Sequence, residues 1–245
     1  MCNLYESTPR DKINMRHLVK LPEKPYPGTI APLKPGPFVK ADGASDVGQW
    51  GLIPDGSPSQ RPTRTVRTAG VAKLAPMSTN NTRQDKLTHR FSIAAPIWAR
   101  GQRCLIPADT FQEPYWGPLE SPFAKSIARH FRRADGQPWA LAGIWNDWTD
   151  PETGEVVGSY SMITQNCDTH LLLRLMHRPE VDPKTKAILP ADQQDKRAVV
   201  PLEEKDWDAW LHGIPEQAMA LIHLPALEVF LDSPTDPEKQ VALLL

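Results

Sequence analysis

The sequence has few cysteines and lacks the arrangements in which cysteines usually stabilise a small domain. Cys2, Cys104 and Cys167 are an odd number without a C-x-x-C pair, which excludes a disulfide framework and a structural zinc site. No apolar run approaches the roughly 18 residues of a membrane helix, and the N-terminus lacks the basic and apolar regions of a secretory signal. We therefore expect a cytoplasmic protein with no membrane partner and no metal.

Nucleotide-binding motifs and repeats are also absent. The chain contains no Gly-rich phosphate loop and no internal repeat, and we predict that it binds no cofactor. Its 245 residues are 40% hydrophobic, which is enough for an ordinary core. Its 26 prolines are spread along the whole length and do not form one linker. This distribution favours a single loop-rich domain.

Strand and helix signals follow one another irregularly along the chain. Strands are predicted where β-branched and aromatic residues run up to proline or turn residues, at 48–54, 103–107, 139–148 and 156–164. The last two flank an acidic turn that contains Gly154 and indicate a hairpin. Helices are predicted over 8–21 and 203–211. Because strands and helices do not alternate regularly, the predicted fold class is α+β.

The net charge of −1 conceals a strong asymmetry. Residues 57–103 contain nine basic residues and one acidic residue, whereas residues 201–245 contain nine acidic and two basic residues. Such a division suggests one face for phosphates and another for solubility. The alternative is a solvated surface on which the two halves lie against each other.

Cys2 has unusual chemistry once Met1 is removed, which occurs when the second residue is small. The N-terminal cysteine then carries an α-amine with a pKa of roughly 7.7 to 8.0 and a thiol with a pKa of about 8.5 on adjacent carbons. Such a 1,2-aminothiol condenses with an aldehyde to an imine, and the sulfur then closes a thiazolidine ring. The position of Cys2 alone leaves open the alternative that it is an ordinary cysteine near a chain end.

Several short motifs occur in a fixed order along the chain. They are Met1-Cys2-Asn3-Leu4-Tyr5, Ile30-Ala31-Pro32, Trp50-Gly51-Leu52-Ile53-Pro54, Asn81-Thr82-Arg83, Arg103-Cys104-Leu105-Ile106-Pro107-Ala108 with Phe111 and Glu113, Ala142-Gly143-Ile144-Trp145, and Met176-His177-Arg178-Pro179. This set resembles the SRAP family, the SOS-response-associated peptidases that crosslink to abasic sites in DNA. The resemblance runs from residue 2 to about residue 212. It implies one SRAP-like domain over 1–245, with a barrel-like core of mostly antiparallel or mixed β-sheet, flanking helices and an acidic extension over 213–245.

The resemblance also implies roles for individual residues. Cys2 would be the nucleophile that traps the open-chain aldehyde of an abasic deoxyribose. Asn81 would hold the N-terminal residue and the lesion through its amide, and Arg83 would bind a backbone phosphate. Glu113 would act as the acid and base of carbinolamine dehydration. His177 would help to open the sugar ring or move protons.

The implied partner is single-stranded or junction DNA that contains abasic sites, bound by a monomer. Arg61, Arg64 and Arg67 lie in the basic segment and are candidates for phosphate contacts. The sequence departs from the common family pattern at Leu4, where many members have arginine, so one candidate DNA contact is missing. A second departure is an insertion between Pro179 and Lys196.

Other interpretations of the same residues remain open. Without the family, Asn81 would be a loop residue, Glu113 an exposed carboxylate and His177 a structural histidine. A glutamine amidotransferase-like amidohydrolase also begins with cysteine after methionine, but it commonly carries an Asn-Gly pair, and the sequence has none. A DNA-binding module without covalent chemistry would keep the basic segment and not need Cys2. The family name also implies peptidase activity, which here would be self-removal of Met1.

Overall fold

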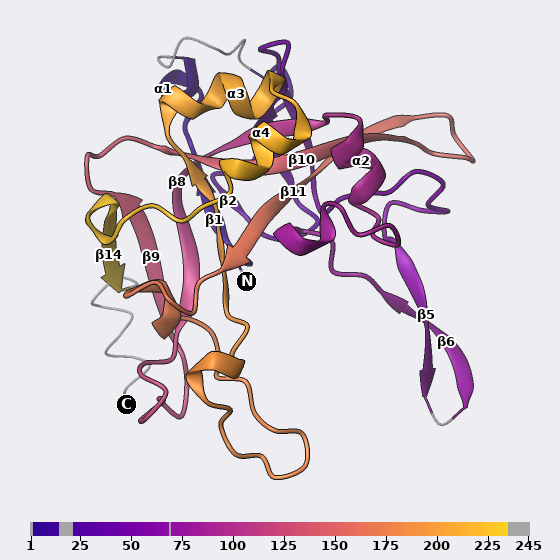
Figure 1. Ribbon diagram of the computed structural model, residues 1–245. Coiled ribbons are helices and arrows are strands. Elements are labelled where there is room, and N and C mark those ends of the chain that lie inside the picture. The colour runs from indigo at the N-terminus through magenta and orange to yellow at the C-terminus, as the bar shows by residue number, and fades with distance from the viewer. Residues whose placement is uncertain (1, 15–21, 69, 235–245) are drawn as a thin grey trace.

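The computed structural model describes residues 2–14, 22–68 and 70–234, and its centre is a closed β-barrel (Figure 1). The barrel strands are β3 (Pro35–Val39), β4 (Ser45–Trp50), β8 (Arg103–Tyr115), β10 (Trp139–Thr149) and β11 (Val156–Asn166). They pair in the order β10-β11-β4-β3-β8, and β8 pairs again with β10. The β11–β4 pair is parallel and the other four pairs are antiparallel. The mixed barrel confirms the predicted α+β class and barrel-like core.

Further strands extend the barrel sheet. They are β1 (Tyr5–Ser7), β2 (Thr29–Ile30), β7 (Asn81–Arg83), β9 (Ile127–Arg133), β12 (Arg197–Val199), β13 (Pro201–Leu202) and β14 (Phe230–Pro234). Strand β1 pairs with β8, and β7 lies parallel to β11. A separate two-stranded sheet, β5 (Thr63–Thr68) with β6 (Val71–Pro76), projects from the body as a hairpin (Figure 1).

The helices are short. The α-helices are α1 (Arg10–Asn14), α2 (Ala95–Ala99), α3 (Trp207–His212) and α4 (Pro215–Ala220), and the 3-10 helices are η1 (Gln84–Lys86), η2 (Leu173–Leu175), η3 (Ala191–Gln193), η4 (Glu204–Asp206) and η5 (Leu227–Val229). The helix predicted over 203–211 is present as η4 and α3. The helix predicted over 8–21 is α1 within the described residues, since 15–21 lie outside them.

Two apolar clusters explain why the barrel strands carry nearly continuous hydrophobic runs. Along β10, Trp139 and Leu141 belong to one cluster, and Ala140 and Ala142 belong to the other. The second cluster also contains Trp98 of α2 and residues of α3 and α4. Both faces of β10 are therefore buried, as expected for a sheet covered on both sides. The predicted hairpin is confirmed, and Asp150 Oδ1 accepts hydrogen bonds from two backbone N–H groups of its turn.

Gly48 is required where the barrel closes between β4 and β11. A Cβ atom there would overlap the backbone carbonyl of Gly158 and lie 2.9 Å from Phe38 Cε1. We expect Gly48→Ala to lower the free energy of unfolding by about 1–3 kcal/mol, because backbone cannot move aside as a flexible side chain does. Urea denaturation measures the change. Gly28→Ala is the control, since no atom lies within 4 Å of its Cβ position, and an equal loss in both variants would contradict the steric explanation.

The C-terminal part of the chain takes part in the same sheet. Strand β14 pairs with β9 from Phe230↔Arg133 to Pro234↔Arg129, and α4 packs against α3. Residues of the predicted acidic extension thus contact the body up to residue 234. Residues 235–245 lie outside the described part of the chain.

Candidate functional site

Cys2 lies at the centre of the candidate site, three residues before the start of β1. Its side chain is 0% exposed. Its backbone carbonyl accepts a hydrogen bond of 2.7 Å from Asn81 Nδ2 and another of 3.2 Å from Asn80 Nδ2. Asn81 is positioned by the pairing of β7 with β11, where it lies opposite Met162. The structure thus brings Cys2 and Asn81 together.

Asn80 is a site residue that the sequence analysis missed. Ser78 Oγ donates a 2.8 Å hydrogen bond to Asn80 Oδ1, which orients the amide so that its Nδ2 faces Cys2. The backbone carbonyl of Asn80 accepts hydrogen bonds from Trp50 Nε1 and from the N–H of Met162. Asn80 is therefore held on three sides, and the only sequence signal for it was the Asn80-Asn81 doublet.

Glu113, which is buried, pairs with the partly buried His177 and acts electrostatically on Cys2. Glu113, on β8, is 0% exposed, and its Oε2 lies 3.0 Å from His177 Nε2. His177 has a left-handed backbone with φ of 61°, and its N–H donates a 2.7 Å hydrogen bond to the carbonyl of Pro114. A non-glycine residue in this conformation is uncommon and must be held by its surroundings. Because the side chain of Glu113 is fully buried, its interpretation as an exposed carboxylate is wrong.

Burial and the charge of Glu113 keep the nearby thiols protonated. Burial, and secondly Glu113, raise the pKa of Cys2 well above its ordinary value. Burial, then Glu113, then Asp168 raise the pKa of Cys167 to about 12. The Cys2 thiol donates a 3.2 Å hydrogen bond to the carbonyl of Leu4. At neutral pH the sulfur is thus a thiol, and it needs a proton acceptor before it can form a bond.

The raised thiol pKa values predict a loss of stability at alkaline pH. Cys2, Cys104 and Cys167 all have raised pKa values, burial being the largest cause. The folded state therefore holds protons that the unfolded state releases above about pH 8.5. Their stabilisation is complete below that pH and is lost as pH rises further, by up to about 1.4 kcal/mol per pH unit for each thiol. Urea denaturation between pH 7 and 10.5 measures the slope, which Cys104→Ala should reduce by one thiol's share. A flat profile would contradict this account.

Arg83 has carboxylate partners within the protein. Its Nε lies 2.8 Å from Asp85 Oδ1 and its Nη1 lies 2.7 Å from Asp195 Oδ2. The hydrogen bond with Asp85, followed by that with Asp195, raises the pKa of Arg83. Asp195 comes from the segment inserted after Pro179. A DNA phosphate would therefore compete with two carboxylates for this guanidinium.

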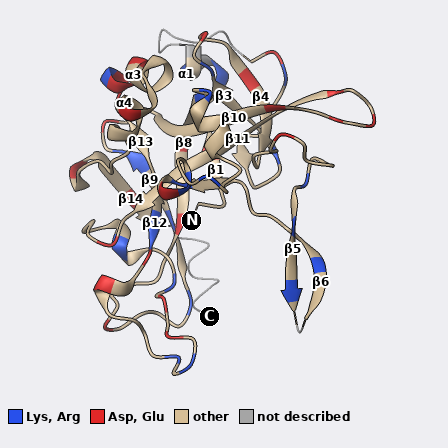
Figure 2. Ribbon diagram, turned by 45° about the vertical axis from the view of Figure 1, so that its right-hand side comes forward, with Lys and Arg blue, Asp and Glu red and all other residues tan. Residues whose placement is uncertain are grey.

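Arg61 lies just before strand β5, and Arg64 and Arg67 lie on it. All three side chains are exposed. In β5 and β6, Figure 2 shows basic residues and no acidic residue. In the described part of the chain, none of the three arginines forms an ion pair. The hairpin thus presents unneutralised positive charge beside the body of the protein.

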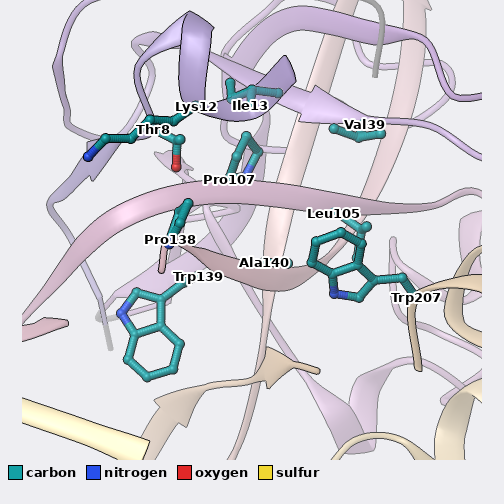
Figure 3. Close-up of a pocket in the computed structure, with 10 residues that line it drawn as sticks. All are labelled: Thr8, Lys12, Ile13, Val39, Leu105, Pro107, Pro138, Trp139, Ala140 and Trp207. Atoms are coloured by element: carbon teal, nitrogen blue, oxygen red, sulfur yellow. The ribbon is translucent and has the colours of Figure 1, made fainter. Parts of the chain in front are cut away.

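A small apolar pocket lies under α1 (Figure 3) and contains none of the predicted site residues. Thr8, Pro107, Trp139 and Trp207 are among the side chains that line it, and its volume is about 40 Å³. That volume is close to that of one water molecule. The pocket is therefore too small to bind an organic substrate.

Neither a membrane-spanning helix nor a metal-binding cluster occurs among the described residues. No helix among them is long and apolar enough to cross a membrane. Within the same ranges, no group of three or more His, Cys, Asp or Glu side chains is arranged to hold a metal ion.

Known proteins resemble the chain in fold and in sequence. A solved structure of a protein from Bordetella bronchiseptica is 25% identical with a TM-score of 0.75, covering 96% of this chain and 100% of that one. A second, from Bacteroides thetaiotaomicron, is 17% identical with a TM-score of 0.67 over 98% and 94% of the two chains, and shows the fold alone. "Abasic site processing protein HMCES" of Pongo abelii is 26% identical over 137 residues, which are 47% of this chain and 36% of that protein.

The family comparison covers most of the chain. The model of the SOS response associated peptidase (SRAP) family matches residues 22–230. This range includes Asn81, Glu113 and His177 and runs through the first residue of β14. With the barrel fold shared by the solved structures, the match shows that the chain belongs to the SRAP family.

Proposed function

We propose that this protein captures abasic sites in DNA through a covalent bond to Cys2. The observation that carries the proposal is the position of the buried Cys2. Two asparagine amides donate hydrogen bonds to its carbonyl, and Glu113, which pairs with His177, raises the pKa of its thiol. Membership of the SRAP family supports it. So does the likeness to a relative whose name describes abasic site processing, although this chain spans only 36% of that relative.

The chemistry requires that Met1 has been removed, by the protein itself or by an aminopeptidase. The free α-amine of Cys2 adds to the aldehyde carbon of the ring-opened deoxyribose and gives a carbinolamine. Loss of water gives an imine. The sulfur then adds to the imine carbon as its proton passes to the nitrogen, so the sum is aldehyde plus aminothiol giving thiazolidine and one water. Ring closure removes the electron sink that would promote β-elimination and strand cleavage.

The surrounding residues suit these proton transfers. Glu113 lies close enough to Cys2 to raise the pKa of its thiol. We assign two roles to Glu113: it protonates the departing hydroxyl of the carbinolamine, and it accepts the proton of the sulfur. His177 is 3.0 Å from Glu113 Oε2 and exchanges protons with it. Asn81 Oδ1 is buried and has no hydrogen-bond partner among the described residues. A buried unsatisfied acceptor calls for a partner, and a sugar hydroxyl of the lesion would supply one.

A denaturing gel tests the proposal. The substrate is a uracil-containing single-stranded oligonucleotide, with or without prior treatment with uracil glycosylase, and mass spectrometry confirms the loss of Met1. We expect a heat-stable shifted band that requires both the abasic site and Cys2. Cys2→Ala should abolish the band and Cys104→Ala, a buried cysteine outside the site, should retain it. A band that survives in Cys2→Ala, or no band for the processed protein, would overturn the proposal.

The β5–β6 hairpin is assigned to phosphate binding. Each phosphate contact to single-stranded DNA contributes about 0.7 to the slope of log affinity against log salt. Replacing Arg61, Arg64 and Arg67 together with glutamine should therefore reduce that slope by about 2 and weaken binding at low salt. Fluorescence anisotropy across a salt series measures it. Arg132→Gln, which removes an arginine 3.7 Å from Glu6, should leave the slope unchanged, and an unchanged slope in the triple variant would exclude the hairpin from the interface.

A further inference from the structure

Phe91 is exposed in a way that the fold does not explain. Its side chain is 76% exposed, whereas Phe38, Phe111, Phe131 and Phe230 are buried. The remaining phenylalanine, Phe123, is 42% exposed but packs against Tyr115 with ring centroids 5.5 Å apart. An aromatic ring stabilises a protein when it is buried. A ring left in water contributes little to folding, and this makes it a candidate for contact with a ligand.

The two preceding side chains lie against the ring of Phe91. The guanidinium of Arg90 lies over it, 4.1 Å from its centroid, and the centroid of the His89 ring lies 5.9 Å away. Arg90 forms no ion pair within the described ranges, unlike Arg83, Arg100 and Arg133, which pair with carboxylates. Arg90 and Phe91 thus present a planar cation and a planar ring, both available at the surface.

The segment that carries this pair is anchored at both ends. Before it, Leu87 is 0% exposed, and after it, Ala94 is 1% exposed at the start of α2. Between them, the N–H of Ser92 donates to the carbonyl of His89, and Ser92 Oγ accepts from the N–H of Ala94. The turn is therefore held without covering Phe91. Chain continuity places it one short helix, η1, beyond Asn81 and Arg83 of β7.

We propose that Arg90 and Phe91 form a stacking site for an unpaired nucleobase that flanks the lesion. Stacking on an aromatic ring assisted by an arginine is sequence-tolerant, because every base has a π face. A binding site for a base is favoured over a protein-docking surface because an exposed ring beside an arginine with no ion pair in the described ranges matches an anionic, aromatic ligand. The inference rests on the proposed function only in taking DNA as the partner.

The test separates base contacts from backbone contacts. Anisotropy titrations use Cys2→Ala protein, so that no covalent bond forms, with two single-stranded oligonucleotides of equal length. One carries bases throughout, and the other carries tetrahydrofuran residues, which lack bases, at the positions flanking the centre. Phe91→Ala should weaken binding of the first about 5- to 150-fold and leave binding of the second unchanged. Phe91→Trp should restore it, and Leu231→Ala, an exposed apolar side chain on β14, should have no effect.

An equal loss on both oligonucleotides, or no loss on either, would overturn the stacking site. Base-dependent binding that persists while no abasic crosslink forms would overturn the proposed function and leave this inference standing. If Phe91→Ala forms the crosslink at the normal rate and its base-dependent affinity is unchanged, the stacking site is overturned and the proposed function stands. Binding of a protein ligand that Phe91→Ala abolishes, without any effect on DNA, would also count against it.

Discussion

Glu113→Gln is expected to slow crosslink formation by about 10²- to 10⁴-fold, the range over which a general acid or base contributes to a reaction. Glutamine preserves the volume of this fully buried side chain but can neither protonate the departing hydroxyl nor accept the proton of the sulfur. Single-turnover gels with an abasic oligonucleotide measure the rate. Affinity for the same DNA should be unchanged, because Glu113 is assigned no phosphate contact.

The control for this experiment is Asp109→Asn. Asp109 lies on the same strand, β8, and its carboxylate is 3.5 Å from Lys12 Nζ, outside the Cys2 group. The Asp109→Asn variant should form the crosslink at the wild-type rate. A normal rate in Glu113→Gln would remove Glu113 from the mechanism. A variant with normal thermal unfolding but a slow reaction separates loss of proton transfer from loss of fold.

Removing both amides that hold Cys2 should have the second largest effect. Asn81→Ala removes the 2.7 Å hydrogen bond to the Cys2 carbonyl and Asn80→Ala removes the 3.2 Å one. Either single variant keeps one hydrogen bond to the Cys2 carbonyl, and we expect crosslinking to slow by only about 3-fold, as for the loss of one weak hydrogen bond. The double variant loses both, and because misplacement by about 1 Å can cost 10²-fold, we expect a loss of at least about that size.

The double-mutant cycle on crosslinking rates tests whether the two amides act on the same atom. If they do, the double loss should differ from the product of the single losses. Asn166→Ala, an exposed asparagine at the end of β11, is the control and should react normally. Wild-type rates in the double variant would show that positioning of the Cys2 carbonyl does not limit the reaction.

The fold was predictable where local signals were strong. Strands rich in apolar residues were predicted at 139–148 and 156–164, on either side of an acidic turn. The structure contains this hairpin as β10 and β11, with the turn where it was predicted. Phe123, Ile127 and Phe131 have helical spacing, but the turn signal Asp135-Gly136 follows them, so the sequence alone leaves this element undecided. It forms β9, because pairing with β8 and β14 outweighs the local spacing. The proline, threonine and arginine residues of 55–68 favour a surface loop. The end of this stretch instead forms β5, because its pairing partner β6 follows directly.

The site was predictable only through the family resemblance. Spacing could not place His177 3.0 Å from Glu113, because the two lie on separate segments that meet through the folding of the sheet. The resemblance also implies that Arg83 is available for a phosphate. Its pairing with Asp195 depends on where the inserted segment folds back, and no local pattern contains that information.

The sequence by itself determined the α+β class, the strong strands, the charge asymmetry and the presence of a cysteine at position 2. These features depend on composition, position and short-range periodicity. Only the tertiary structure decided that Glu113 is buried, that Asn80 joins Asn81 on the Cys2 carbonyl, and that Phe91 remains in solvent. The physical reason is that burial and hydrogen bonding between distant segments are set when β8 pairs with both β3 and β10 to close the barrel.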